Sequence, residues 1–293
     1  MKRWIVYIVT ALCLPWGIEA QNTSFPLPEV PQILVSPADR ANYLSVHYWD
    51  LFDFTNNALI DKPEITEQGF ANFISIMPYV TEKKEAFAVF ARRMAENPKM
   101  LAHLLELSEH YLFDNFSPVY DEELYLLLVD ELLEQSRLSL AQRERLRYHR
   151  KWMLKNRVNQ VAADFSFVLR NGSRMSLQDV KADYILLYLN DPECSACQQT
   201  KDALMKSRVL ARWKDSGRMK ILSVCTEGKT AGWKNIPVPQ GWIDGCDDQK
   251  RLLEEGLYDL RNLPAIYLLD RDKRIVIKNA TIHSVEQALK QLE

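Results

Sequence analysis

Apolar residues in the first half of the chain recur with the spacing of amphipathic helices. Over residues 66–77 they stand at positions i, i+3, i+4 and i+7, as Phe70, Phe73, Ile74 and Met77. This spacing places all four side chains on one face of a helix. Similar stripes predict helices over the ranges 39–52, 81–96, 99–113, 117–133 and 140–156. The pattern therefore predicts an all-α domain over residues 39–156, which is long enough to bury a core of its own.

Polar residues mark where the predicted helices begin. Ser36 or Asp39 suits the start of the first helix and Ser139 the start of the last, because their side chains accept hydrogen bonds from free N–H groups. Ser117-Pro118 suits the start of the fifth helix. The last helix is rich in arginine, which is typical of a solvated face or of a face set against a second domain.

In the second half, over residues 159–293, short apolar runs alternate with helical patterns. Asn171-Gly172 separates two extended runs and predicts a hairpin. The predicted strands cover 165–169, 173–177, 184–189, 220–225, 264–270 and 274–279, and the predicted helices cover 197–213, 247–255 and 284–291. This alternation predicts an α/β domain with a mostly parallel sheet. The whole chain is thus expected to have a two-domain α+β fold.

The first twenty residues differ from the rest. Lys2 and Arg3 precede an uncharged run over residues 4–14, and we predict a cleavage site near Ala20. This order is typical of a secretory signal peptide, whereas a membrane anchor would need a longer apolar run to span about 30 Å of hydrocarbon. Residues 21–38 carry four prolines and predict an extended leader. We therefore expect an exported, periplasmic protein with no stable membrane insertion once residues 1–20 are removed.

Composition narrows the classes of function. A chain of 293 residues is expected to hold about two domains. The net charge is −2 and no basic run is present, which argues against a nucleic-acid partner. With nine glycines and 10% aromatic residues, extensive disorder is not expected. Nothing in the sequence indicates a bound cofactor.

Residues 184–201 carry the most informative chemistry. An apolar strand pattern is followed by a polar break and then by Cys194 and Cys197, at the start of a helical pattern. Free N–H groups and a partial positive charge at a helix N-terminus lower the pKa of a thiol placed there. Cys194 is therefore the candidate nucleophile. Cys197 lies one helical turn further on and can close a disulfide with it.

A Cys-x-x-Cys pair by itself also occurs in zinc knuckles and structural bridges. A second feature is the strand that opens at Leu263-Pro264, where the missing proline N–H is tolerated. Together with the upstream hairpin at Asn171-Gly172, these features resemble the thioredoxin fold and its TlpA-like and peroxiredoxin-like (AhpC-TSA-like) branches. The aromatic cluster at residues 48–54 resembles helical domains of unknown function that precede TlpA-like domains in exported bacterial proteins.

The resemblance implies a thiol–disulfide oxidoreductase with Cys194 and Cys197 as its redox-active pair. In this family the proline is cis and faces the disulfide. Pro264, the backbone of Leu263 and the neighbouring Glu193 are therefore the candidate substrate-guiding residues. The implied partners are protein thiols or disulfides and an upstream redox partner, with no cofactor. The alternative is a non-catalytic binding protein of thioredoxin fold that holds only a structural disulfide.

Three positions depart from the family pattern. Glu193 stands where an aromatic residue is usual, and a carboxylate beside Cys194 is expected to raise the pKa of that thiol. TlpA-like reductases commonly carry a glutamate where this chain has Thr200. Thioredoxin carries an aspartate in the preceding strand where this chain has Tyr188. Both usual internal proton acceptors are thus expected to be missing.

Two further cysteines remain after loss of the signal peptide, Cys225 and Cys246. The resulting even count is compatible with disulfides in an oxidising compartment. We predict a second disulfide between them, with Cys225 at a strand end and Cys246 in a loop that returns to the same end of the sheet. The rival hypothesis makes one of them a relay thiol for Cys194 and Cys197. A zinc site is not predicted, because the spacing lacks a second close pair.

Overall fold

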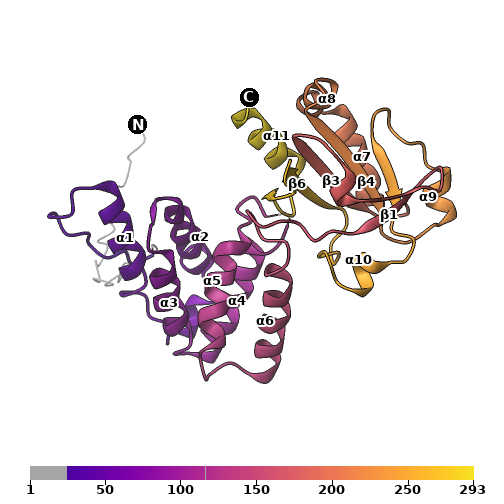
Figure 1. The fold of residues 1–293 in the computed structure, drawn as a ribbon. Coiled ribbons are helices and arrows are strands. Elements are labelled where there is room, and N and C mark those ends of the chain that lie inside the picture. Colours follow the sequence, from indigo (N-terminus) through magenta and orange to yellow (C-terminus); the bar gives the residue numbers. More distant parts are fainter. Residues whose placement is uncertain (1–24, 116) are drawn as a thin grey trace, which may run out of the picture.

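The computed structural model describes residues 25–115 and 117–293. Figure 1 shows two parts side by side: a group of helices coloured indigo to magenta, and a sheet with its covering helices, mostly orange to yellow. We call residues 25–156 the helical domain and residues 159–293 the sheet domain. The α+β fold class expected from the sequence is confirmed. The predicted signal peptide lies outside the described residues.

Six α-helices build the described part of the helical domain. They are α1 (Pro37–His47), α2 (Thr66–Ile76), α3 (Lys83–Met94), α4 (Pro98–Leu112), α5 (Glu122–Leu133) and α6 (Leu140–Met153), with two short 3-10 helices, η1 (Asn57–Leu59) and η2 (Met77–Tyr79). Their apolar stripes meet in one core. At its centre Trp49 is fully buried and stacks on Phe90 of α3, with ring centroids 4.5 Å apart. The aromatic residues at helical spacing are thus core residues.

Side-chain caps explain where several of these helices begin. Ser139 begins α6 as predicted, and its side chain forms a capping box with Gln142. The prediction that the fifth helix begins at Ser117 was wrong. Asp121 caps α5 instead, because its carboxylate accepts the N–H groups of Glu123 at 3.1 Å and Leu124 at 3.0 Å.

The leader is fixed to the helical domain by Phe25. This side chain is buried and stacks on Tyr48, with ring centroids 4.9 Å apart. Gly69 of α2 lets the ring approach, since a Cβ built on Gly69 would lie 2.2 Å from the Phe25 ring. The described part of the leader therefore acts as a strap across the helices.

The sheet domain is built on seven strands in the order β2-β1-β5-β4-β3-β6-β7. They are β1 (Ser166–Leu169), β2 (Arg174–Ser176), β3 (Tyr184–Asn190), β4 (Met219–Cys225), β5 (Ile243–Cys246), β6 (Ala265–Asp270) and β7 (Ile275–Ile277). The helices here are α7 (Ser195–Lys206), α8 (Arg208–Asp215), α9 (Ala231–Asn235), α10 (Arg251–Glu254) and α11 (Ile282–Gln291), with the 3-10 helix η3 (Leu177–Asp179).

Two expectations about this sheet were wrong. The sheet is mixed, because only β3–β4 and β4–β5 pair in parallel while the other four neighbouring pairs are antiparallel. Residues 243–246, expected to be a loop, form β5 and place Cys246 in the sheet. The run Ile243–Cys246 contains an aspartate and a glycine, and its short pattern lacks the apolar signature of a buried strand.

Helices α7, α8 and α11 pack on one face of the sheet. Leu204 of α7, Trp213 of α8 and Leu289 of α11 share a core with Tyr188 of β3. The opposite face packs against η3, α10 and the segment around Tyr258. Strand β3 is therefore covered on both faces, which explains its continuous apolar run.

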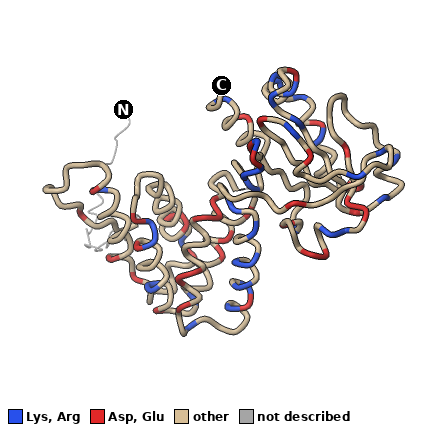
Figure 2. Tube along the Cα trace, in the orientation of Figure 1, with Lys and Arg blue, Asp and Glu red and all other residues tan. Residues whose placement is uncertain are grey.

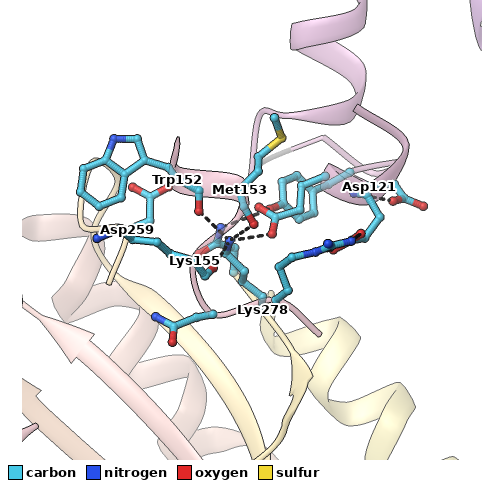
Figure 3. A network of polar contacts seen from close by, with 12 residues as sticks. Asp121, Trp152, Met153, Lys155, Asp259 and Lys278 are labelled. Carbon is cyan, nitrogen blue, oxygen red and sulfur yellow. Dashed lines mark hydrogen bonds and ion pairs between the residues drawn. The ribbon is translucent and has the colours of Figure 1, made fainter. Parts of the chain in front are cut away.

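Lys278 joins the two domains at the end of β7. Its ammonium lies 2.7 Å from Glu122 of α5, and the two side chains are 2% and 7% exposed. The ammonium also donates to the carbonyls of Trp152 (3.1 Å), Met153 (3.3 Å) and Lys155 (2.8 Å), as Figure 3 shows. Helix C-termini leave such carbonyls without intrahelical partners. One buried cation is thus paired with an acid of the helical domain and donates to carbonyls at the end of α6.

The arginines of α6 are paired within the helical domain. Figure 2 shows Lys and Arg in blue along this helix. Arg145 contacts Glu109 at 2.6 Å, Arg147 contacts Glu144 at 2.7 Å, and Arg150 contacts Asp130 at 2.6 Å. Across residues 25–115 and 117–293, no helix combines the length and the apolar character that a bilayer span requires.

Candidate functional site

Cys194 lies at the point where β3 gives way to α7. The backbone N–H of Cys194 donates to the carbonyl of Asp191 at 3.2 Å, which closes the turn. Cys194 is the N-cap residue of α7, and its sulfur accepts the N–H of Cys197 at 3.3 Å. Its side chain is partly exposed. A free helix N–H aimed at the sulfur stabilises negative charge there, which is what a thiolate nucleophile requires.

Cys197 has a different environment one turn along α7. It is only 2% exposed, and burial raises the pKa of its thiol to about 12, helped by its hydrogen bond to Cys194. The Tyr188 hydroxyl of β3 donates to the carbonyl of Cys197 at 2.5 Å and fixes this turn of the helix against the sheet. The arrangement makes Cys194 the accessible sulfur and Cys197 the sheltered one.

Leu263 and Pro264 face this pair from β6. Leu189 of β3 lies opposite Ala265 of β6 in the antiparallel register, so the residues just before β6 reach the carboxyl end of β3. The Leu263–Pro264 peptide bond is cis. The Cys194 thiol lies 3.9 Å from the carbonyl oxygen of Leu263. The structure therefore brings together Cys194 and Leu263, which are 69 residues apart in the sequence.

Glu193 is exposed beside Cys194. Its backbone N–H donates to the carboxylate of Asp191 at 2.9 Å. A Cβ built on Gly232 would lie 3.2 Å from a carboxylate oxygen of Glu193, so the side chain rests against α9. Its role in guiding substrate stays a prediction.

Cys225 and Cys246 lie opposite each other in the parallel pair β4–β5. Both are free thiols in the structure, are at most 1% exposed and pack with Trp233. A hydrogen bond between them lowers the pKa of Cys225 and raises that of Cys246. The disulfide expected between them is not formed in the structure, yet the register places them as direct neighbours. The bridge stays a prediction.

A cavity of about 520 Å³ beside Cys197 was not anticipated from the sequence. Its lining includes Asp191, Lys201 and Tyr188 in addition to Cys197. The Lys201 ammonium donates to the carbonyl of Pro237 at 2.8 Å, and burial lowers its pKa. Lys201 lies four residues after Cys197, a spacing that places two side chains on one helix face. That spacing was the sequence signal for this wall of the cavity.

Comparison with known proteins supports this reading of the chain. A family described as a domain of unknown function (DUF5106) matches residues 15–156. A thioredoxin-like protein from Bacteroides caccae is 31% identical and superposes with a TM-score of 0.83, covering 92% of this chain and 99% of that protein. The chain belongs to the thioredoxin-like family. The resemblance predicted from the cysteine pair and the Leu-Pro strand is thus confirmed, and it includes the helical domain.

Two shorter structures each match less than half of the chain. The C-terminal domain of an uncharacterized protein from Bacteroides fragilis is 33% identical, with a TM-score of 0.45 over 46% of this chain and 98% of that one. The thioredoxin domain of a thiol-disulfide oxidoreductase from Bacteroides vulgatus is 24% identical, with a TM-score of 0.39 over 46% of this chain and 97% of that one. The comparison with curated proteins gives no match.

Proposed function

We propose that this thioredoxin-like protein exchanges disulfides with protein substrates through Cys194 and Cys197. One observation carries the proposal. The Cys194 sulfur is partly exposed, accepts the N–H of Cys197 at 3.3 Å, and lies 3.9 Å from the carbonyl of Leu263, the residue before Pro264. A helix N-terminus stabilises the attacking thiolate, and the absent N–H of Pro264 leaves no donor that competes for the sulfurs.

In the reducing direction, the Cys194 thiolate attacks one sulfur of a substrate disulfide. A mixed disulfide forms, and the other substrate sulfur leaves as a thiolate that takes up a proton. Cys197, once deprotonated, attacks the Cys194 sulfur and releases the second substrate thiol. Two electrons pass to the substrate and the protein keeps a Cys194–Cys197 disulfide. A dithiol partner upstream then reduces that disulfide, and the reverse sequence oxidises a dithiol substrate.

The geometry gives each cysteine its own part in this sequence. A mixed disulfide must form at a sulfur that the substrate can reach, and Cys194 is the accessible one. Cys197 is buried with a pKa of about 12, so it remains a thiol until Cys194 is consumed. Loss of the Cys194 thiolate removes the charge that opposes ionisation of Cys197, which favours the second attack at that stage.

We also propose that the chain works outside the cytoplasm, in the periplasm. The support is the pair Lys2 and Arg3 followed by the uncharged run over residues 4–14. Intact-mass measurement of the protein from the periplasmic and cytoplasmic fractions of its native host tests this. Export predicts a chain that starts close to residue 21, whereas a chain that retains residues 1–20 in the cytoplasmic fraction would refute it.

Replacement of Cys197 by serine tests the exchange function. The variant cannot resolve a mixed disulfide, so it should accumulate covalent complexes through Cys194 that vanish on reduction. The double variant Cys194→Ser/Cys197→Ser is the matched control and should trap nothing. If the single variant also traps nothing, and fails to react with a small activated disulfide, the site is inert. The chain is then a binding protein of thioredoxin fold.

A further inference from the structure

A cleft of about 540 Å³ opens between the helical domain and the loop that precedes Pro264. The proposed redox chemistry of Cys194 and Cys197 assigns no role to this cleft, and the sheet domain alone does not form it. One wall comes from α4 and α6, and the other comes from the loop. The lining includes Glu106, Glu109, Arg145, His149, Arg261 and Asn262.

The cleft includes part of the loop that contacts the nucleophile. Asn262 lines it and directly precedes Leu263, whose carbonyl oxygen lies 3.9 Å from the Cys194 sulfur. An extended polypeptide advances about 3.3 Å per residue. A substrate segment that presents its cysteine to Cys194 along Leu263 therefore reaches the cleft within about three residues. The helical-domain side of the cleft is thus within reach of such a segment.

Arg261 fixes this wall in place. Its guanidinium carbon lies 4.8 Å from the ring centroid of Phe113 and 5.6 Å from that of Tyr148, both in the helical domain. The guanidinium is also paired with Asp259 of its own loop at 2.6 Å. Cation–π contacts of this kind strengthen when the cation is partly desolvated. The buried Lys278 ion pair joins the same two domains, so the two walls of the cleft are held in a fixed relative position.

The charges of the cleft leave an unused acceptor. Arg145 contacts one carboxylate oxygen of Glu109 at 2.6 Å. The other oxygen, Oε2, is shielded from solvent and has no hydrogen-bond partner among the described residues. Arg261 is balanced by Asp259, and Glu106 adds an exposed carboxylate at the rim. Glu106 is therefore a carboxylate of the cleft that a bound cation can reach.

His149 adds no positive charge at neutral pH. Burial lowers the pKa of this side chain to about 4, and the nearby guanidiniums of Arg261 and Arg145 act in the same direction. The Tyr125 hydroxyl lies 3.2 Å from its Nδ1 atom. The cleft is therefore acidic in balance, with a neutral imidazole on its floor.

We propose that this cleft binds the substrate segment next to the reacting cysteine and selects segments that carry a lysine or arginine there. The basic side chain pairs with the exposed Glu106 at the rim, and the acidic balance of the cleft favours it. This inference rests on the proposed exchange function, since it needs a substrate cysteine at Cys194. It assigns the helical domain to substrate selection.

The test measures mixed-disulfide formation in the Cys197→Ser background. Each peptide has one cysteine, activated as its mixed disulfide with 2-nitro-5-thiobenzoate. The peptides of a pair differ at one position, which holds either lysine or glutamate. That position lies two or three residues before or after the cysteine. Attack by Cys194 releases the coloured thiolate. We expect the best lysine peptide to react about tenfold faster than its glutamate counterpart, and we expect salt to reduce this ratio.

Charge-neutral variants locate the effect. The double variant Glu106→Gln/Glu109→Gln should lower the ratio of lysine-peptide to glutamate-peptide rates to about twofold. Glu106→Gln alone should also lower this ratio, and because Glu106 is exposed the change has little effect on folding. Glu144→Gln removes a paired acid of α6 outside the cleft and should keep the ratio. An unchanged ratio in the double variant overturns the cleft inference while leaving the exchange function intact. If neither peptide nor the activated disulfide of 2-mercaptoethanol reacts at Cys194, the exchange function itself fails, and this inference fails with it.

Discussion

Lys278 of the sheet domain and Glu122 of the helical domain form an ion pair of 2.7 Å that both domains bury. Burial raises the pKa of Glu122, although the positive charge of Lys278 opposes that shift. The Tyr120 hydroxyl also donates to Glu122 at 2.9 Å, and Asn279 donates to that hydroxyl at 3.1 Å. The pair is thus part of a hydrogen-bonded network, which is the condition under which buried charges are tolerated.

Lys278→Met should destabilise the protein strongly. The change leaves the Glu122 carboxylate buried without its cation and leaves the final carbonyls of α6 without a donor. Removal of one partner of a buried ion pair costs about 3–5 kcal/mol in free energy of unfolding. Urea unfolding followed by tryptophan fluorescence measures this loss.

Two further variants separate the causes of that loss. Adding Glu122→Gln to Lys278→Met removes the unpaired buried charge, and it should restore part of the lost stability. Lys290→Met changes an exposed lysine of α11 and should alter the free energy of unfolding by less than about 0.5 kcal/mol. If Lys278→Met behaves like Lys290→Met, the ion pair does not join the domains.

The two site cysteines should react with alkylating agents at very different rates. Cys194 is partly exposed, whereas Cys197 is 2% exposed and burial raises its pKa to about 12. Since the thiolate is the reactive form, iodoacetamide at pH 8 should modify Cys194 at least about tenfold faster. Tandem mass spectrometry of the fully reduced protein, quenched at short times, measures both sites. Equal rates would contradict the assignment of Cys194 as the attacking sulfur.

Local chemistry allowed much of this molecule to be predicted. The apolar stripe from Phe70 to Met77 predicted a helix, because apolar residues with a period of 3.6 share one face of a helix but not of a strand. The Cys194 pair and the Leu263-Pro264 strand start were recognised because helix N-termini and proline each restrict the backbone strongly. These are short-range constraints, and their signals are contained in a few consecutive residues.

The features that were missed depend on long-range pairing. Strand β5 was expected to be a loop because its four residues form a strand only between β1 and β4. The cleft at Arg261 involves residues from α4, α6 and a loop more than a hundred residues later in the sequence. No periodicity links such residues. Ser117 was chosen as a helix start over Asp121, since both are good caps and only packing selects between them.

Cys225 and Cys246 should form a disulfide when the protein is oxidised. Their direct opposition across β4 and β5 places the two thiols together, and the bridge would close a loop of about 21 residues, stabilising the fold by about 3 kcal/mol. Non-reducing peptide mapping after air oxidation should find the linked pair. In a background where Cys194 and Cys197 are both serine, the oxidised protein should be more stable to unfolding than the reduced protein. Adding Cys225→Ala/Cys246→Ala to this background should abolish that difference. A Cys225–Cys197 link would instead support the relay hypothesis.

His149 is a buried base held in its neutral form. Burial is the main cause of its lowered pKa, about 4, and Arg261 and Arg145 add to it, while Asp259 opposes the shift. Its Nε2 atom lies 3.9 Å from Glu109, and the Tyr125 hydroxyl lies 3.2 Å from its Nδ1 atom. The side chain is 8% exposed, so solvent screens these effects little.

The folded protein should therefore lose stability as the pH falls from about 6.5 towards 4. In this window the unfolded chain binds a proton at His149 and the folded chain does not, so protonation favours unfolding. The pKa difference, from 6.5 to about 4, corresponds to about 3 kcal/mol. Urea unfolding at pH 7 and pH 5 should show the loss for wild type and a smaller loss for His149→Gln. The exposed His283→Gln of α11 is the matched control, and it should keep the full pH dependence. If His149→Gln shows the same loss as wild type, other groups cause the pH dependence.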